Sequence, residues 1–206
     1  MTILVIAQPE VEPLTLAEAR LHLRITATTE DDTITRLIKA ARLRLEKETG
    51  RAFIEQTLEY RGEDFPGCAP YRIKIPRPCL IELQSIKYLD VDGVLQTVGS
   101  SNYDVIDGGD WESMVQPIAT FDWPQVIDDR PDAVRLRFRA GWEGSGSPQD
   151  LASNIPDDIK QAMLLLVGHW FENREQVFVA PAREVVQQLP DGVSRLTDNW
   201  TVAYVA

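Results

Sequence analysis

The chain has 206 residues, of which 26% are charged, and its formal net charge is −11. This length can bury a sizeable core as one domain, or as one domain with an insertion. No apolar run is long enough to cross a bilayer, and residues 1–7 lack the basic region of a signal peptide, so we expect no membrane association. Cys68 and Cys79 are too few for a disulfide scaffold and are expected to be two buried or half-buried thiols.

The acidic charge is concentrated in the middle of the chain. Residues 101–150 carry 10 acidic and 4 basic side chains, whereas residues 1–50 carry 8 and 7. An acidic surface repels a phosphate backbone at long range. Stable wrapping of nucleic acid is therefore not expected, although DNA can still pass close to such a surface without binding to it.

The first part of the chain predicts a short strand followed by two helices. Residues 2–7 are β-prone, and Thr15 and Glu18 have the spacing of a capping box that begins the first helix. The polar stretch 28–32 begins a second helix, whose apolar side chains recur at helical spacing. Gly50 stands where a left-handed residue should end this helix.

After Gly50 the sequence changes to short runs of β-branched and aromatic residues separated by turn signals. The runs cover residues 53–60, 71–75, 81–91, 94–98, 103–106 and 133–140. Asp92-Gly93 predicts a tight hairpin turn with positive φ at both central positions. We therefore expect an antiparallel β-subdomain inserted between helices.

A long apolar helix is predicted over residues 155–174. Pro156 suits its first helical position, and Asp157 and Asp158 place negative charge at the positive end of the helix dipole. The apolar side chains cover most of the circumference, so other elements must pack around this helix. A further short helix is predicted over residues 190–198. The fold class is therefore α+β, a small helical bundle with an inserted antiparallel β-subdomain.

The predicted domain organisation follows these elements. Residues 1–52 and 150–199 form the helical bundle, residues 53–141 the β-subdomain, 142–149 a linker, and 200–206 a C-terminal docking tail. The tail is apolar and β-prone, which makes it a poor free end. Either it pairs as a strand with the chain's own sheet, or it docks on a neighbouring chain by strand addition or pocket insertion.

No motif predicts catalysis, a cofactor or a metal site. The two histidines and two cysteines lack zinc-ligand spacing. The calcium-like stretch 90–93 lacks the later glutamate, and the glycines at 144–146 match no phosphate-binding loop. Of the three paired aspartates, two stand at helix starts, where the helix dipole explains them. We expect that the protein is not an enzyme.

Arg135, Arg137 and Arg139 alternate with apolar residues, so a strand would place all three guanidinium groups on one face. This face is either solvated and offset by nearby acidic residues, or a contact with an adjacent subunit or with passing DNA. Sequence-specific readout is not expected, because no groove-entering motif is present.

Two blocks of the sequence resemble the head–tail connector (adaptor) proteins of long-tailed phages. The resemblance is carried by Pro13 to Arg24, Asp31 to Phe53, Ile155 to Glu175 and Leu189 to Leu196. It covers residues 13–60 and 154–200 and rests on the order and co-occurrence of packing and capping patterns. The longer members of this family, found in prophages and gene transfer agents, carry a β-rich insertion between the two blocks.

The resemblance implies a structural virion protein at the neck, made in the bacterial host cytoplasm. In family members the helical bundle builds a homo-oligomeric ring, commonly of twelve subunits, beneath the portal protein. The ring extends the channel for double-stranded DNA, which passes without specific binding, and it presents a surface to the stopper or tail-completion protein.

Carried over by position, the C-terminal segment would contact the portal. Its candidate residues are Leu189, Val193, Leu196, Trp200, Val202 and Tyr204. A head-to-tail ring needs two complementary faces on each subunit. The inter-subunit candidates are Arg135, Arg137, Arg139, Asp128 and Asp129. The alternative is a small nucleic-acid-binding or regulatory module that uses the arginine face.

Overall fold

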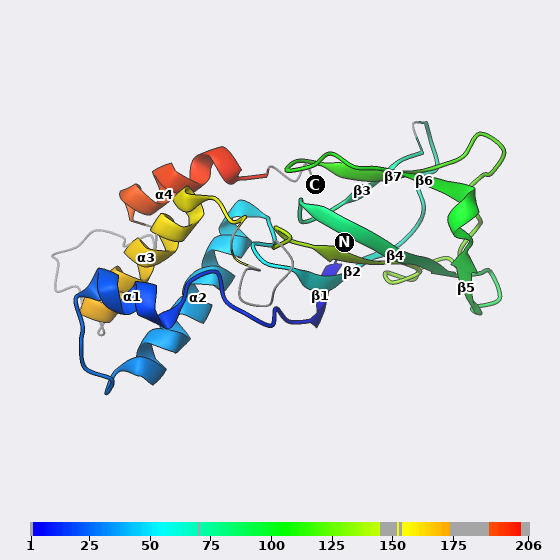
Figure 1. Cartoon of the computed structure of the whole chain (residues 1–206). Coiled ribbons are helices and arrows are strands. Elements are labelled where there is room, and N and C mark those ends of the chain that lie inside the picture. Colours follow the sequence, from blue (N-terminus) through cyan, green and yellow to red (C-terminus); the bar gives the residue numbers. More distant parts are fainter. Residues whose placement is uncertain (1, 70, 145–151, 153, 174–189, 203–206) are drawn as a thin grey trace, which may run out of the picture.

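The computed structural model describes residues 2–69, 71–144, 152, 154–173 and 190–202 (Figure 1). Helices gather at one end of the molecule, and two antiparallel sheets form the other end. The predicted α+β class with a β-rich insertion between helices is confirmed. None of the helices described is both long and apolar enough to cross a membrane.

The two N-terminal helices begin where the sequence predicts, and the second also ends where it predicts. Helix α1 spans Leu16–Leu23 and starts with a capping box, in which the Glu18 N–H donates to Thr15 Oγ1 at 3.2 Å and the Thr15 N–H donates to Glu18 Oε2 at 2.7 Å. Helix α2 spans Asp31–Thr49 and ends at Gly50 with φ 70°. A left-handed residue after the last turn is the usual helix end.

Helix α3 (Asp157–Glu172) lies in the centre of the helical core, and helix α4 (Asp191–Thr197) packs beside it. The buried residues of α3 pack with residues of α1 and α2, and they are Ile159, Ala162, Met163, Leu166 and Val167. The prediction for Pro156 was wrong by one position, because Pro156 is the N-cap and the helix begins at Asp157. Helix boundaries commonly shift by one residue in this way.

The larger sheet has five antiparallel strands in the order β1-β2-β8-β4-β5, and the smaller has the order β3-β7-β6. The strands are β1 (Thr2–Ala7), β2 (Gln56–Gly62), β3 (Ile73–Ile75), β4 (Leu80–Leu89), β5 (Leu95–Val98), β6 (Tyr103–Ile106), β7 (Ser113–Pro117) and β8 (Val134–Ala140). Strand β7 was not predicted. Residues 2–7 were predicted to belong to the helical bundle. Strand β1 pairs with β2 instead, so these residues belong to the larger sheet.

The hairpin between β4 and β5 is present, but its predicted turn geometry was wrong. Gly93 has φ 76°, whereas Asp92 is not among the residues with positive φ. The loop is longer than a two-residue turn, with the Gly93 N–H donating to the Asp90 carbonyl at 2.8 Å and the Asp90 N–H to the Val94 carbonyl at 3.0 Å. The Asp90 carboxylate organises it by accepting the N–H groups of Asp92 and Val94.

Two apolar cores lie side by side along the molecule. One is formed by the helices and includes Phe53 and Trp142, and the other lies between the two sheets around Leu136 and Phe138. Trp142 follows β8, and Phe53 precedes β2. The chain segments that connect helices and sheets are therefore buried where the two cores meet.

Candidate functional site: the junction that holds the C-terminal segment

The C-terminal segment returns to the boundary between helices and sheets after α4. A short 3-10 helix, Asp198–Trp200, brings Trp200 against Trp142, with ring centroids 5.6 Å apart and an interplanar angle of 86°. The Val202 N–H donates to the Thr49 carbonyl at the end of α2, at 2.8 Å. We call Arg51, Trp111, Trp142 and Trp200 the Arg51 junction.

Arg51 is fully buried at the centre of this junction. Its Nε donates to the Trp200 carbonyl and its Nη1 to the Asp110 carbonyl. Its guanidinium carbon lies 4.9 Å from the ring centroid of Trp111, 5.8 Å from that of Trp142 and 5.6 Å from that of Trp200. A cation within about 6 Å of an aromatic centroid is attracted by the ring. Arg51 therefore joins three segments that are far apart in the sequence.

Asp110 supports the junction from the loop between β6 and β7. Its carboxylate accepts the indole N–H of Trp142 at 3.2 Å and lies 3.5 Å from the Cys79 sulfur. Burial, followed by the negative charge of Asp110, raises the pKa of the Cys79 thiol to about 12. Cys79 is a buried free thiol, as expected, whereas Cys68 is an exposed one, so the expectation of two buried or half-buried thiols was wrong for Cys68.

Buried polar groups also hold the C-terminal end of α2 in place. The Glu46 carboxylate accepts the Phe53 N–H at 2.9 Å, the Gln56 amide at 3.0 Å and Arg42 Nη1 at 3.0 Å. Burial raises the pKa of Glu46, against the attraction of Arg42. Arg77 donates to the carbonyls of Glu46 and Arg51. These contacts tie α2 to β2 and to the segment before β4.

The predicted portal-contacting residues divide into two groups. Val193 is fully buried, Leu196 and Trp200 are partly buried against the helical core, and all three contact their own chain. Val202 is half-buried, and Leu189 and Tyr204 lie outside the described residues. Residues 200–202 form no strand among the described residues, and residues 203–206, which complete the predicted tail, lie outside them. Both alternatives for the tail therefore stay predictions.

The three arginines of β8 do lie on one face of the larger sheet, and each is paired within the chain. Their closest partners are Asp132 for Arg135 at 2.8 Å, Glu59 for Arg137 at 2.9 Å, and Glu55 for Arg139 at 2.5 Å. We call the three arginines Arg135, Arg137 and Arg139 the arginine ladder. An offset of this face by nearby acidic residues was one of the predicted alternatives, and these pairs provide it. A contact of the same face with an adjacent subunit stays a prediction.

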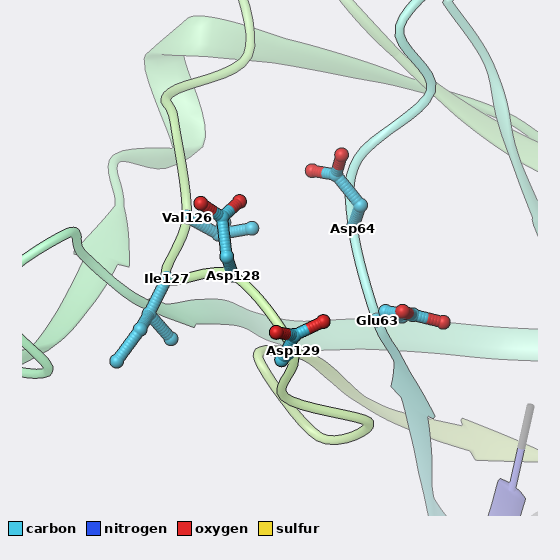
Figure 2. A pocket seen from close by; sticks show the side chains of 6 residues that line it. All are labelled: Glu63, Asp64, Val126, Ile127, Asp128 and Asp129. Atoms are coloured by element: carbon cyan, nitrogen blue, oxygen red, sulfur yellow. The ribbon is translucent and has the colours of Figure 1, made fainter.

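Asp128 and Asp129 lie elsewhere, at the end of the larger sheet remote from the helices. Figure 2 shows them facing Glu63 and Asp64 across a shallow hollow. None of the ion pairs among the described residues joins Asp128 or Asp129 to the arginine ladder. Across the same residues, no group of three or more acidic, histidine or cysteine side chains is arranged to hold a metal.

Sequence reasoning missed the Arg51 junction. Arg51 follows a helix end, and Trp111, Trp142 and Trp200 are spread over ninety positions with no common motif. Arg51 and Trp200 are separated by 149 positions, so only the fold brings them together. The only signal in the sequence was the apolar character of the tail, which requires a partner surface.

Comparison with known proteins places these features in context. Residues 13–74 match the family model for phage gp6-like head-tail connector proteins. No curated protein matches the chain.

Three solved structures match over all of this chain and 98% of theirs. A chain in the virion of a native gene transfer agent particle has a TM-score of 0.70 and 21% identity. Chains in the neck of the empty particle with C6 symmetry and of the native particle with C12 symmetry have TM-scores of 0.70 and 0.67, each at 20% identity. The resemblance to the head–tail connector family is thereby confirmed over residues 13–74, and the whole chain has the fold of these gene transfer agent chains.

Proposed function

We propose that the protein is a head–tail adaptor, a subunit of a ring in the virion neck that joins the portal to the stopper or tail. The observation that carries this proposal is the likeness of fold along the whole chain to chains of gene transfer agent necks. The connector-family match over residues 13–74 supports it independently. The C12 symmetry of one of these necks favours a ring of twelve subunits.

The described structure suits a structural role at this position. Two apolar cores lie next to each other, and a buried hydrogen bond from Gln56 of β2 to Glu46 of α2 connects the helices to the larger sheet. The net charge of −11 lets DNA pass through a channel without adhering to it. The proposed role is structural and involves no enzymatic step. The domain boundaries predicted from the sequence remain part of this proposal, with residues 2–7 assigned to the sheet.

In this proposal the C-terminal segment is the portal-facing part. Val193, Leu196 and Trp200 anchor the segment on its own chain, and the residues from Val202 onward reach the portal. Leu189 and Tyr204 remain proposed contacts. The Arg51 junction sets the point from which the tail leaves the subunit.

The nucleic-acid alternative is not favoured. DNA binding through the arginine ladder requires cations available to phosphates, and the ladder is paired with Glu55, Glu59, Glu82 and Asp132. A binding protein would show affinity that falls steeply with salt. The adaptor proposal predicts no such binding in a gel-shift assay.

The first experiment measures solution mass by light scattering, followed by negative-stain imaging, with and without the cognate portal. The adaptor proposal predicts rings, either alone or on the portal. A strict monomer that ignores the portal contradicts it.

A pair of truncations then tests the tail. Removing residues 203–206 leaves the Arg51 junction intact and is expected to weaken portal attachment without changing the melting temperature. Removing residues 200–206 also deletes Trp200 and should lower both. Full portal attachment after the shorter truncation would show that the tail is not the portal-facing part.

A further inference from the structure

The two edge strands of the larger sheet are β1 and β5. Among the described residues, the backbone of β1 pairs only with β2 and that of β5 only with β4. A free edge presents a row of unpaired N–H and C=O groups that can pair with a strand of another chain.

Exposed apolar side chains gather at these two edges. Eleven large apolar side chains are exposed among the described residues, and five of them lie here. They are Val5 and Ile6 on β1, and Val91, Val94 and Leu95 on β5 and the hairpin before it. Val5 is 47% exposed and Leu95 46% exposed. Single exposed apolar residues are ordinary, but their concentration marks a contact surface.

Both edges are also free of charge. Residues 2–9 and 93–103 contain no charged side chain, although 26% of the chain is charged. Natural sheets usually protect a free edge with charged residues, prolines or bulges. Here β1 has only a register shift at Ile6, which leaves residues 2–5 regular. Because two copies with a net charge of −11 repel each other, neutral edges are the surfaces where they approach most easily.

The two edges have the relative direction that a continuing sheet requires. Each of the four steps from β1 to β5 is antiparallel, so β1 and β5 run in the same direction. Both begin at the end remote from the helices, where Thr2 lies opposite Arg61 and Leu95 opposite Leu89. The β1 edge of one copy can therefore lie parallel to the β5 edge of the next. A contact between two different surfaces is the head-to-tail kind that closes rings.

We propose that β1 of one subunit pairs with β5 of a second copy of this chain, so that the five-stranded sheet continues from subunit to subunit around the ring. This proposal rests on the proposed function, because it names the lateral contact of that ring. In each subunit, β1 pairs with β5 of one neighbour, and β5 pairs with β1 of the other neighbour.

The test uses the full chain assembled with its portal and substitutes each edge separately. Val5→Lys and Leu95→Glu are each expected to reduce the yield of rings at least tenfold, since each places an unpaired charge in a neutral contact. Leu21→Lys, at a site on α1 that is 81% exposed, is the matched control and should assemble as the wild type does.

Cross-linking provides a second measurement that does not depend on those charges. In a Cys68→Ser background, Thr2→Cys combined with Thr97→Cys is treated with a short thiol cross-linker, because Thr2 and Thr97 lie at the same level of the sheet through Arg61, Arg135 and Lys87. The proposal predicts a ladder of covalent oligomers, whereas each cysteine alone gives monomer. Covalent dimers from Thr2→Cys alone would show a symmetric contact and overturn the proposed pairing.

The outcomes separate this inference from the proposed function. Wild-type rings together with rings of normal yield from both charged single variants and no covalent ladder overturn the edge pairing and leave the adaptor role standing. Absence of wild-type rings in the presence of the portal overturns both. If a charged variant fails to fold, as judged by its circular dichroism melt, the covalent ladder decides.

Discussion

The Arg51 junction and the arginine ladder use the same side chain in opposite ways. Arg51 is fully buried, surrounded by three tryptophans, and bonded to carbonyls of distant segments. The ladder arginines lie on the sheet surface and pair with carboxylates of the adjacent strand β2, of the residue before β2 and of the loop before β8. The alternating arginines could be recognised in the sequence and the Arg51 junction could not. It is nevertheless the junction that connects α2, the loop between β6 and β7 and the C-terminal segment.

This difference follows from solvent exposure. A surface ion pair replaces contacts of each side chain with water by a contact between the two side chains. It therefore contributes only about 0–1 kcal/mol to stability. A buried guanidinium must be held by several groups at once, so removing one of them has a larger effect. The junction should therefore be sensitive to single substitutions and the ladder tolerant of them.

The largest contrast is expected in thiol reactivity. With a pKa of about 12, only about one in ten thousand Cys79 thiols is ionised at pH 8. Cys68 is exposed, so an alkylating reagent should label Cys68 while Cys79 stays unmodified in the folded protein. Mass spectrometry of partially labelled protein measures this, and guanidinium should abolish the difference. Equal rates without denaturant would mean that the junction is open.

Glu46→Ala should cause the largest loss of stability, about 2–4 kcal/mol, because it leaves the buried Phe53 N–H and the Gln56 amide without their acceptor. Arg42 keeps its second partner, Glu12, at 2.6 Å. The matched control is Glu48→Ala on the same helix, where an exposed pair with Arg44 at 2.6 Å contributes below about 1 kcal/mol. Denaturant unfolding compares the two, and similar losses would contradict the special role of Glu46.

Arg51→Lys should lower the free energy of unfolding by about 1.5–3 kcal/mol, because lysine keeps the charge but cannot donate to two carbonyls in a fixed fork. Amide exchange at Val202, whose N–H donates to Thr49, should accelerate. Arg137→Lys in the ladder is the control and should change neither quantity by a measurable amount. Unchanged exchange at Val202 would mean that Arg51 does not hold the segment.

The ion pairs of the arginine ladder should make the free energy of unfolding depend on pH in the acid range. Burial alone would raise the pKa of Glu59, but hydrogen bonds from Arg61 and Arg137 outweigh it and lower the pKa. A carboxyl with a lowered folded pKa stabilises the protein above its unfolded pKa, and this contribution is lost as the pH falls through the folded value. Glu59→Gln should cost about 1 kcal/mol at neutral pH and flatten the acid limb of stability. An unchanged acid limb would count against this pairing.

The local parts of the fold could be predicted because short-range chemistry determines them. Thr15 and Glu18 form the predicted capping box, and Gly50 ends α2. Strand β7 was missed because Ser113, Gln116 and Pro117 have low strand preference, and pairing on both sides supplies what the sequence lacks.

The long-range parts could not be predicted from one sequence. The partner of β1 lies more than fifty positions away, and the Arg51 junction collects residues over 149 positions. The alternation of Arg135, Arg137 and Arg139 correctly predicted a shared face. It carried no information on whether Glu55, Glu59 and Glu82 would lie beside them.

The most direct test of the account is a cryo-electron microscopy reconstruction of the chain bound to its portal. The account predicts a ring in which Trp200 remains against Arg51 and residues 203–206 contact the portal. Portal contacts made instead by the remote end of the larger sheet, near Asp128 and Asp129, with the C-terminal segment pointing away, would contradict it.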